Sequence, residues 1–203
     1  MALQPSLSPL IIVGSSAAPH TLEFFLDYVC PYSAKIALSI DNILKPLFDA
    51  NGKYANQTKI IFRNQVQPWH GTSTFVHEAS LAVARVAPEQ FWPFSLALFK
   101  AQDDYFDIPS SDLTPKQIRQ KLADLAAPFI GNDKKDSFLD LLALKLTSNG
   151  GVAVTDDLKY TIKYSRQNGI HVSPTVLFDG LVVNEISSGW SEDDWNKWLA
   201  SKL

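Results

Sequence analysis

The feature that most constrains this chain of 203 residues is its single cysteine, Cys30, which joins a strongly apolar segment to an amphipathic one. Residues 21–29 (TLEFFLDYV) have the composition of a buried central strand. Residues 31–47 then carry apolar side chains at helical spacing, and Pro31 suits a first helical turn, where a backbone N–H is not needed. We therefore expect Cys30 to lie between a buried strand and the start of a helix.

A thiol at the start of a helix is expected to be reactive. The first N–H groups of a helix have no partner within the helix, and the helix dipole is positive at that end. Both effects favour the thiolate, so we expect Cys30 to be a stronger nucleophile at neutral pH than an average cysteine. The opposing interpretation is that Cys30 is merely a small buried apolar residue, as free cysteines often are.

The rest of the chain predicts further strands separated by helices. Residues 59–66 (KIIFRNQV) alternate as a second strand, and Pro46 should kink or end the helix before them. Residues 72–168 have a mostly helical pattern. Asp179–Gly180 separates two later β-rich segments, which is a strong hairpin signal. In the N-terminal arm, only residues 10–13 are expected to pair with a sheet edge.

Two segments, residues 25–33 (FLDYVCPYS) and 172–175 (VSPT), resemble the thioredoxin superfamily, specifically its DsbA-like branch. The likeness covers nearly the whole chain. It implies an α/β thioredoxin fold with a central mixed β-sheet and a large all-helical insertion between the second and third core strands. It also implies that the Ser173–Pro174 peptide bond is cis and lies opposite the thiol, and that the backbone of Ser173 pairs with substrate.

This resemblance also predicts the domain organisation. We expect a single DsbA-like domain over residues 1–203. Its thioredoxin core should comprise about 20–70 and 169–203, and the helical insertion about 71–168.

The chain departs from the oxidoreductase pattern at Ser33, where that family has a second cysteine. Without a resolving thiol, Cys30 cannot complete an internal dithiol–disulfide cycle. An external thiol such as glutathione could still resolve a mixed disulfide on Cys30, and Ser33 could hydrogen-bond the thiolate. The leading hypothesis is a thiol-dependent oxidoreductase with Cys30 and Ser33 as catalytic residues, no permanently bound cofactor, and glutathione as co-substrate.

Two alternatives remain open. The stretch 27–33 also resembles kappa-class glutathione transferases and chromene-carboxylate isomerases, which carry Ser-Pro-Tyr-Ser in the same context. Those enzymes hold the glutathione thiolate with the serine that aligns with Cys30, so a kappa-like transferase or isomerase is the second hypothesis. The third is a non-catalytic thioredoxin-fold module that binds protein partners, suggested by the missing second cysteine.

Five further residues are predicted to contact substrate: Pro31, Tyr32, His70, Ser173 and Pro174. Tyr32 is expected to face substrate more than Tyr28, which is more typical of a core residue. His70 follows the second strand on a loop that could bring its imidazole near Cys30, although it could equally begin the next helix. Ser191 could bind a glutathione carboxylate at the start of the last helix, but an ordinary helix cap is the stronger expectation.

Composition and spacing argue against several classes of partner. The 18 Lys and Arg residues are scattered in a chain of net charge −3, so no nucleic-acid partner is expected. No His spacing assembles metal ligands alongside a single cysteine, so no metal is expected. The apolar residues 10–13 are too few to span a bilayer, so no membrane association is expected.

The cellular compartment is predicted from two features. A single cysteine suits a reducing intracellular environment. Ser201–Lys202–Leu203 is the tripeptide that the peroxisomal import receptor reads at a free carboxyl terminus. We expect a peroxisomal protein that binds this receptor, and otherwise a cytoplasmic one in which the tripeptide is only a helix end.

Overall fold

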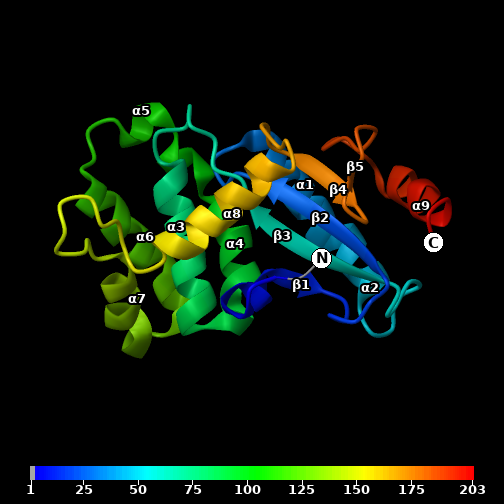
Figure 1. The fold of residues 1–203 in the computed structure, drawn as a ribbon, viewed down its shortest axis with the longest axis horizontal. Coiled ribbons are helices and arrows are strands. Elements are labelled where there is room, and N and C mark those ends of the chain that lie inside the picture. The colour runs from blue at the N-terminus through cyan, green and yellow to red at the C-terminus, as the bar shows by residue number, and fades with distance from the viewer. Residues whose placement is uncertain (1–2) are drawn as a thin grey trace.

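The centre of the fold is strand β2 (His20–Leu26), which pairs in parallel with β3 (Thr58–Asn64) and antiparallel with β4 (Thr175–Phe178) (Figure 1). The computed structural model describes residues 3–203. Two shorter strands, β1 (Ile11–Val13) and β5 (Leu181–Val182), complete a five-stranded mixed sheet in the order β1-β3-β2-β4-β5. The sheet therefore has the parallel and antiparallel pairs that the sequence predicts.

The helices surround this sheet and extend to one side of it (Figure 1). In chain order they are α1 (Pro31–Ser39), α2 (Lys45–Phe48), α3 (Ser73–Val86), α4 (Phe91–Lys100), α5 (Asp107–Ser110), α6 (Pro115–Ile130), α7 (Lys135–Leu142), α8 (Thr155–Gln167) and α9 (Glu192–Ala200). Helices α3 to α8 all fall between β3 and β4 in the chain, which confirms the predicted helical insertion. No helix within residues 3–203 is long and apolar enough to cross a membrane.

The two faces of the sheet are covered differently because side chains alternate along β2. Leu22, Phe24 and Leu26 point into the main core, which α1 and α9 also line. Phe25 points to the other face, where it stacks on Tyr164 of α8. The apolar alternation of β2 thus fixes which helices pack on each side.

The face under α8 also contains a buried ion pair. Arg63 of β3 donates from Nε to Oε2 of Glu23 on β2 at 2.6 Å, and both side chains are almost fully enclosed. The guanidinium lies 4.4 Å from the ring centre of Tyr164. Removing either member of a buried ion pair leaves the other charge buried without a partner, and this strongly destabilises a fold.

Several local predictions are confirmed. Asp179 and Gly180 form the turn between β4 and β5, and Ile11–Val13 pairs with β3. The predicted strand 21–29 is too long at its C-terminal end, because β2 stops at Leu26 and the next three residues form a turn. Asp27 begins that turn.

The predicted break at Pro46 takes the form of a change in helical geometry. Helix α1 continues into a π-helical turn, Ile40–Leu44, and then into the short α2, which ends at Phe48. A proline lacks the N–H of a regular helical hydrogen bond, and a π turn is one way in which a helix adjusts to such a defect.

The close approach of Gly14 to β3 gives a test of the packing at the sheet edge. Gly14 has φ +86°, and a Cβ there would overlap the carbonyl oxygen of Thr58. Gly169 has φ +68°, and a Cβ added there would meet no atom within 4 Å, so it is a matched control. We expect Gly14→Ala to destabilise the fold by about 3 kcal/mol or more, and Gly169→Ala by only about 1–2 kcal/mol for its dihedral angle. Urea denaturation measures both, and equal losses would contradict the packing argument.

Candidate active site

Cys30 lies between the end of β2 and the first residue of α1. Its N–H donates to the Asp27 carbonyl at 3.1 Å, and its own carbonyl accepts from the Ala34 N–H at 3.1 Å. Cys30 is therefore the residue at which the helix begins, and Pro31 occupies the first helical position as predicted. The cysteine is only 6% exposed, so little of it is accessible to solvent.

The sulfur of Cys30 faces a loop that is distant in the sequence. Sγ lies 3.5 Å from the carbonyl oxygen of Ser173, to which the thiol can donate. The Ser173–Pro174 peptide bond is cis, as the resemblance implies. Pairing of β4 with β2 brings this loop to the same end of the sheet as Cys30.

Gln67 holds the same loop from the other side. With its side-chain amide oriented to match its neighbours, Gln67 accepts from the Ser173 N–H at 2.9 Å and donates to the His171 carbonyl at 3.3 Å. The N–H of Ser173, expected to pair with substrate, is therefore engaged by Gln67, and its carbonyl faces the thiol. A peptide substrate would have to displace these contacts to pair with Ser173.

Ser33 is fully buried on the inner side of α1. Its Oγ accepts from the Asp27 N–H at 3.2 Å. The hydroxyl thus joins the first turn of α1 to the turn before Cys30. The contact found for this side chain is with the backbone of Asp27, whereas the sequence predicts one with the thiolate.

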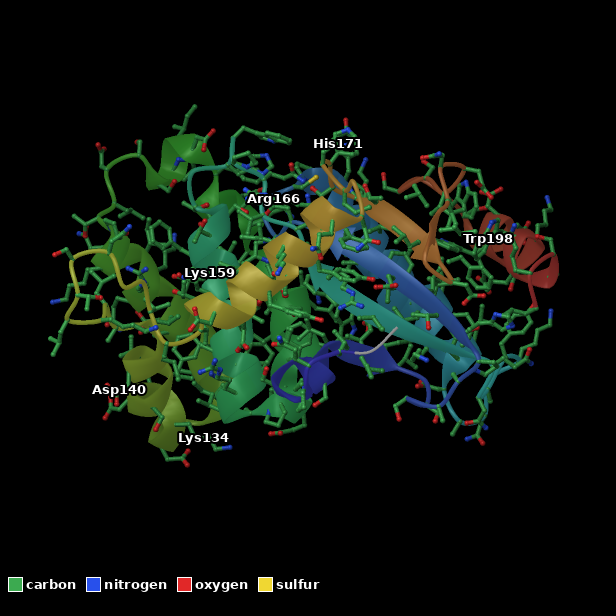
Figure 2. The ribbon with its side chains drawn as sticks, viewed as in Figure 1. Lys134, Asp140, Lys159, Arg166, His171 and Trp198 are labelled. Atoms are coloured by element: carbon green, nitrogen blue, oxygen red, sulfur yellow. The ribbon has the colours of Figure 1, made fainter. Side chains whose placement is uncertain are left out.

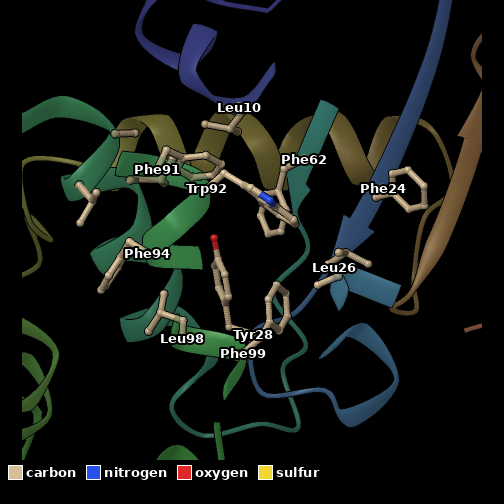
Figure 3. Close-up of a cluster of buried hydrophobic side chains, with 14 of the residues drawn as sticks. Leu10, Phe24, Leu26, Tyr28, Phe62, Phe91, Trp92, Phe94, Leu98 and Phe99 are labelled. Atoms are coloured by element: carbon tan, nitrogen blue, oxygen red, sulfur yellow. The ribbon is translucent and has the colours of Figure 1, made fainter. Parts of the chain in front are cut away.

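Exposed aromatic and apolar side chains lie on each of the three segments that form this site: α1, the loop after β3 and the cis-proline loop. Tyr32 is 61% exposed and Trp69 is 58% exposed, while Val172 of the cis-proline loop is also exposed. Tyr28, by contrast, is fully buried between Phe62 and Phe99, and its hydroxyl lies 2.8 Å from Ser95 Oγ (Figure 3). Of the two tyrosines beside the thiol, Tyr32 is the one that an incoming molecule can reach.

The carboxylate of Asp27, three residues before Cys30, has hydrogen-bond partners at both of its oxygens. Oδ1 accepts from the Val29 N–H at 3.1 Å and from Ser73 Oγ at 3.0 Å. Oδ2 accepts from the Gln67 N–H at 3.1 Å and faces Nδ1 of His70 at 3.0 Å. The carboxylate is completely buried. Its hydrogen bonds connect the turn after β2, the loop after β3 and the start of α3.

A second imidazole lies beside the same carboxylate. His77 Nε2 is 3.5 Å from Asp27 Oδ1, and the His77 side chain is fully buried. Burial alone would raise the pKa of Asp27, but its contacts with His77, His70 and the Val29 N–H outweigh burial and lower the pKa below the ordinary value. Asp27 is therefore an ionised acceptor at neutral pH. Within residues 3–203, no three His, Cys, Asp or Glu side chains are placed to hold a metal ion.

Two grooves flank this arrangement. One, of about 250 Å³, is lined by Val29, Pro31, His70, Tyr105, Phe106 and Asp107. The other, of about 360 Å³, is lined by Gln65, Val66, Pro68, Trp69, Ile162, Ser165, Arg166, Ile170 and His171. Figure 2 shows Arg166 and His171 at one end of α8, where the second groove lies. The first groove includes both chain neighbours of Cys30.

A sequence profile described as thioredoxin matches residues 8–200. The chain belongs to the thioredoxin family. Its structure is similar to that of a candidate protein-disulfide isomerase from Pseudomonas syringae, with a TM-score of 0.71, 26% sequence identity and coverage of 95% of this chain and 97% of that one. No curated protein is detectably similar in sequence.

Two other bacterial structures share the fold of this thioredoxin-family chain. Oxidised BdbD from Bacillus subtilis has a TM-score of 0.62 and 21% identity, covering 98% of this chain and 95% of that one. The thiol-disulfide exchange protein α-DsbA2 from Wolbachia pipientis has a TM-score of 0.63 and 16% identity, covering 94% and 86%. These likenesses confirm the predicted DsbA-like thioredoxin fold, here combined with a single cysteine.

The start of α9 contains its own capping groups. Ser191 Oγ accepts from the Asp194 N–H at 3.3 Å, and the Asp194 carboxylate accepts from the Ser191 N–H at 2.9 Å. The first turn also carries Glu192 and Asp193. Three carboxylates would repel a glutathione carboxylate, so the ordinary helix cap is the better description of Ser191.

Neither Asp27 nor Gln67 was predicted as a site residue from the sequence. For Asp27 a signal is present, because an acidic residue within the apolar segment 21–29 needs hydrogen-bond partners if it is buried. Gln67 gives no comparable signal, since its role depends on a loop more than 100 residues away that the fold brings to it.

The Asp27 carboxylate can be tested by an isosteric change. In the wild-type protein, hydrogen-bond donors face both carboxylate oxygens of Asp27. In Asp27→Asn one of these oxygens is replaced by an NH₂ group, which is itself a donor and cannot accept from them. We therefore expect a loss of about 3 kcal/mol in the free energy of unfolding at pH 7. Asp107→Asn, at an exposed carboxylate, is the control and should change stability by less than about 0.5 kcal/mol.

The effect of Asp27→Asn should also depend on pH. Because the folded-state pKa of Asp27 is lowered, the stabilisation from its ionised form is complete above the unfolded pKa of about 3.9 and is lost as pH falls through the folded value. The difference between wild type and variant should therefore persist from pH 7 to about pH 4 and shrink below it. A difference that grows on acidification would contradict this assignment.

Proposed function

We propose that this chain is a thiol–disulfide exchange enzyme that acts through Cys30 alone and uses a small thiol, glutathione, to release its mixed disulfide. The observation that carries the proposal is the position of the Cys30 sulfur at the start of α1, 3.5 Å from the Ser173 carbonyl in the cis-proline loop. The fold shared with the thiol-disulfide exchange protein α-DsbA2 supports it.

Cys30 stands at the N-terminal end of α1. The N–H groups of Tyr32 and Ser33 lie in the first turn of α1, where a helix has no internal partner for them. Unpaired N–H groups and the positive end of the helix dipole are the general features by which the start of a helix binds negative charge. Tyr32 then offers an exposed aromatic ring to the substrate, and the Ser173 carbonyl that faces the sulfur belongs to the cis peptide bond with Pro174.

The proposed cycle has two displacement steps. In the first, the Cys30 thiolate attacks the glutathionyl sulfur of a glutathionylated substrate, the S–S bond breaks, and the substrate leaves as a thiolate that takes up a proton. In the second, a glutathione thiolate attacks the glutathionyl sulfur bound to Cys30. Oxidised glutathione leaves and Cys30 returns to the thiolate, so the substrate sulfur is reduced to a thiol, the incoming glutathione is oxidised, and the glutathionyl unit from the substrate stays at the disulfide level.

The first test removes the nucleophile. Cys30→Ser is expected to lower the deglutathionylation rate of a glutathionylated peptide to the uncatalysed background, since a hydroxyl is not ionised at neutral pH and cannot form the mixed disulfide. Circular dichroism and urea denaturation of the variant check that it remains folded. Full activity in Cys30→Ser would disprove the proposal.

The same variant separates the other two hypotheses. Conjugation of glutathione to chlorodinitrobenzene that persists in Cys30→Ser would favour a kappa-like transferase or isomerase, whose chemistry needs only a hydroxyl at this position. Binding of protein partners by a wild-type chain that shows neither activity would favour the non-catalytic module.

A second test supplies the missing thiol. Ser33→Cys restores the family's C-x-x-C spacing, so the new thiol can attack a mixed disulfide on Cys30 and form an internal disulfide. We expect this variant, after it has released the substrate thiol, to expel the glutathionyl group from Cys30 as glutathione without any added thiol, and to be left two hydrogens lighter by mass spectrometry. Ser33→Ala is the control and should remain glutathionylated at Cys30 until glutathione is added.

We also propose that the chain is imported into peroxisomes through Ser201, Lys202 and Leu203. In the structure the Leu203 N–H donates to the Leu199 carbonyl at 2.9 Å, and the Leu203 side chain packs partly against the core. Receptor binding at this tripeptide would therefore require the final turn after α9 to open.

Import can be tested with a fluorescent protein fused to the N-terminus. We expect the intact chain to collect in peroxisomes, and chains lacking Leu203 or carrying one extra glycine after it to remain in the cytoplasm. The added glycine keeps the Leu203 side chain and moves only the terminal carboxylate. Equal distribution of all three fusions would contradict the proposal.

A further inference from the structure

His70 has a different environment at each edge of its imidazole ring. Nδ1 faces Asp27 Oδ2 at 3.0 Å, at a carboxylate that is fully buried. Because an ionised carboxylate only accepts hydrogen bonds, Nδ1 carries a proton in every charge state of the ring. In the neutral ring, Nε2 is therefore the basic atom.

His70 is also accessible, unlike the other imidazole at this carboxylate. The His70 side chain is 25% exposed and lines the groove beside Cys30, together with Val29 and Pro31. His77 is fully buried, and its Nδ1 lies 2.9 Å from Asn64 Nδ2 inside the core. Only one of the two rings can exchange a proton with a molecule bound in the groove.

The thiol of Cys30 has a different partner. Its sulfur is directed to the Ser173 carbonyl, and Cys30 itself is not among the groove residues. The groove therefore offers space next to Cys30 with an oriented imidazole in its wall. Its volume of about 250 Å³ is large enough for the cysteinyl part of a small thiol compound.

We propose that this groove binds the small thiol that releases Cys30 from its mixed disulfide, and that His70 takes the proton of that thiol. This inference rests on the proposed function and deepens its second step. The S–H proton moves to Nε2, the new thiolate attacks the outer sulfur of the Cys30 mixed disulfide, and the S–S bond electrons return to Cys30. His70 then loses the proton to solvent. Asp27 is a positioning residue that fixes the ring and its tautomer.

The other titratable groups near His70 are consistent with this role. Asp107 of α5 borders the groove and accepts from the Gly71 N–H at 3.4 Å. Tyr105 lies in the groove wall, and burial raises its pKa, so it stays neutral through the working range. His77 faces the opposite oxygen of Asp27. Within residues 3–203, no Lys or Arg side chain lines the groove.

The experiment isolates the second step. Wild type and variants are first converted to the Cys30–glutathione mixed disulfide with oxidised glutathione, and then mixed with excess glutathione between pH 6 and 9. Mass spectrometry measures, at each time point, the fraction of protein that no longer carries glutathione on Cys30. His70→Gln is the variant, and His171→Gln, at an exposed imidazole in the other groove, is the matched control.

We expect His70→Gln to be slower than wild type by about 100-fold at pH 6.5 and to approach wild type at pH 9. The reason is that glutathione itself supplies thiolate at high pH, whereas near neutrality it needs a base. His171→Gln should follow the wild-type profile. Asp27→Asn, measured where it remains folded, should show the same pH-dependent loss to a smaller degree.

Either an unchanged rate or a loss of equal size at every pH in His70→Gln would overturn the inference, since a purely structural effect has no reason to vanish at high pH. The outcome is separable from that of the proposed function. An inactive Cys30→Ser with a pH-independent His70→Gln leaves the proposed function standing and removes only the role of His70. A fully active Cys30→Ser removes the proposed function, while the pH profile of the chemically prepared mixed disulfide still reports on His70.

Discussion

The buried carboxylate of Asp27 is the interaction on which the arrangement of this site depends. Its hydrogen-bond donors come from three parts of the chain: Val29 in the turn before α1, Gln67 and His70 in the loop after β3, and Ser73 at the start of α3. A buried carboxylate with fewer donors would be destabilising, so these segments are held together by the requirement to satisfy it. The position of the thiol follows, because the turn that Asp27 begins ends at Cys30.

Gln67 extends this constraint to the cis-proline loop. Its backbone N–H binds the Asp27 carboxylate, while its side chain contacts the backbone of His171 and Ser173. One residue thus connects the support of the thiol with the loop opposite the thiol. The two sides of the site are fixed relative to each other through short polar contacts, and the exposed apolar side chains of Tyr32 and Trp69 lie outside them.

The sequence predicted most of the fold because the relevant signals are local. The apolar run before Cys30, the proline after it and the Asp179–Gly180 turn each specify a nearby backbone conformation. The early end of β2 could not be predicted in the same way. Asp27 leaves the strand because its partners, Gln67 and Ser73, lie 40 and more residues away, and only the packed fold brings them together. For the same reason, the sequence predicted His70 as a site residue without its connection to Asp27.

The single cysteine and the groove beside it are related in the proposed mechanism, because a chain with one cysteine needs an external thiol and a place to bind it. A second cysteine at position 33 would attack a mixed disulfide from within the same helix and would need no binding site. Ser33 is buried against the Asp27 backbone. In the proposed cycle the second thiol therefore comes from solution, and it has to be both held and deprotonated near neutral pH. A groove next to Pro31 with His70 oriented by a buried carboxylate would meet both needs. The same carboxylate that ends β2 and starts the turn to the nucleophile therefore also orients the base for the thiol that would release it.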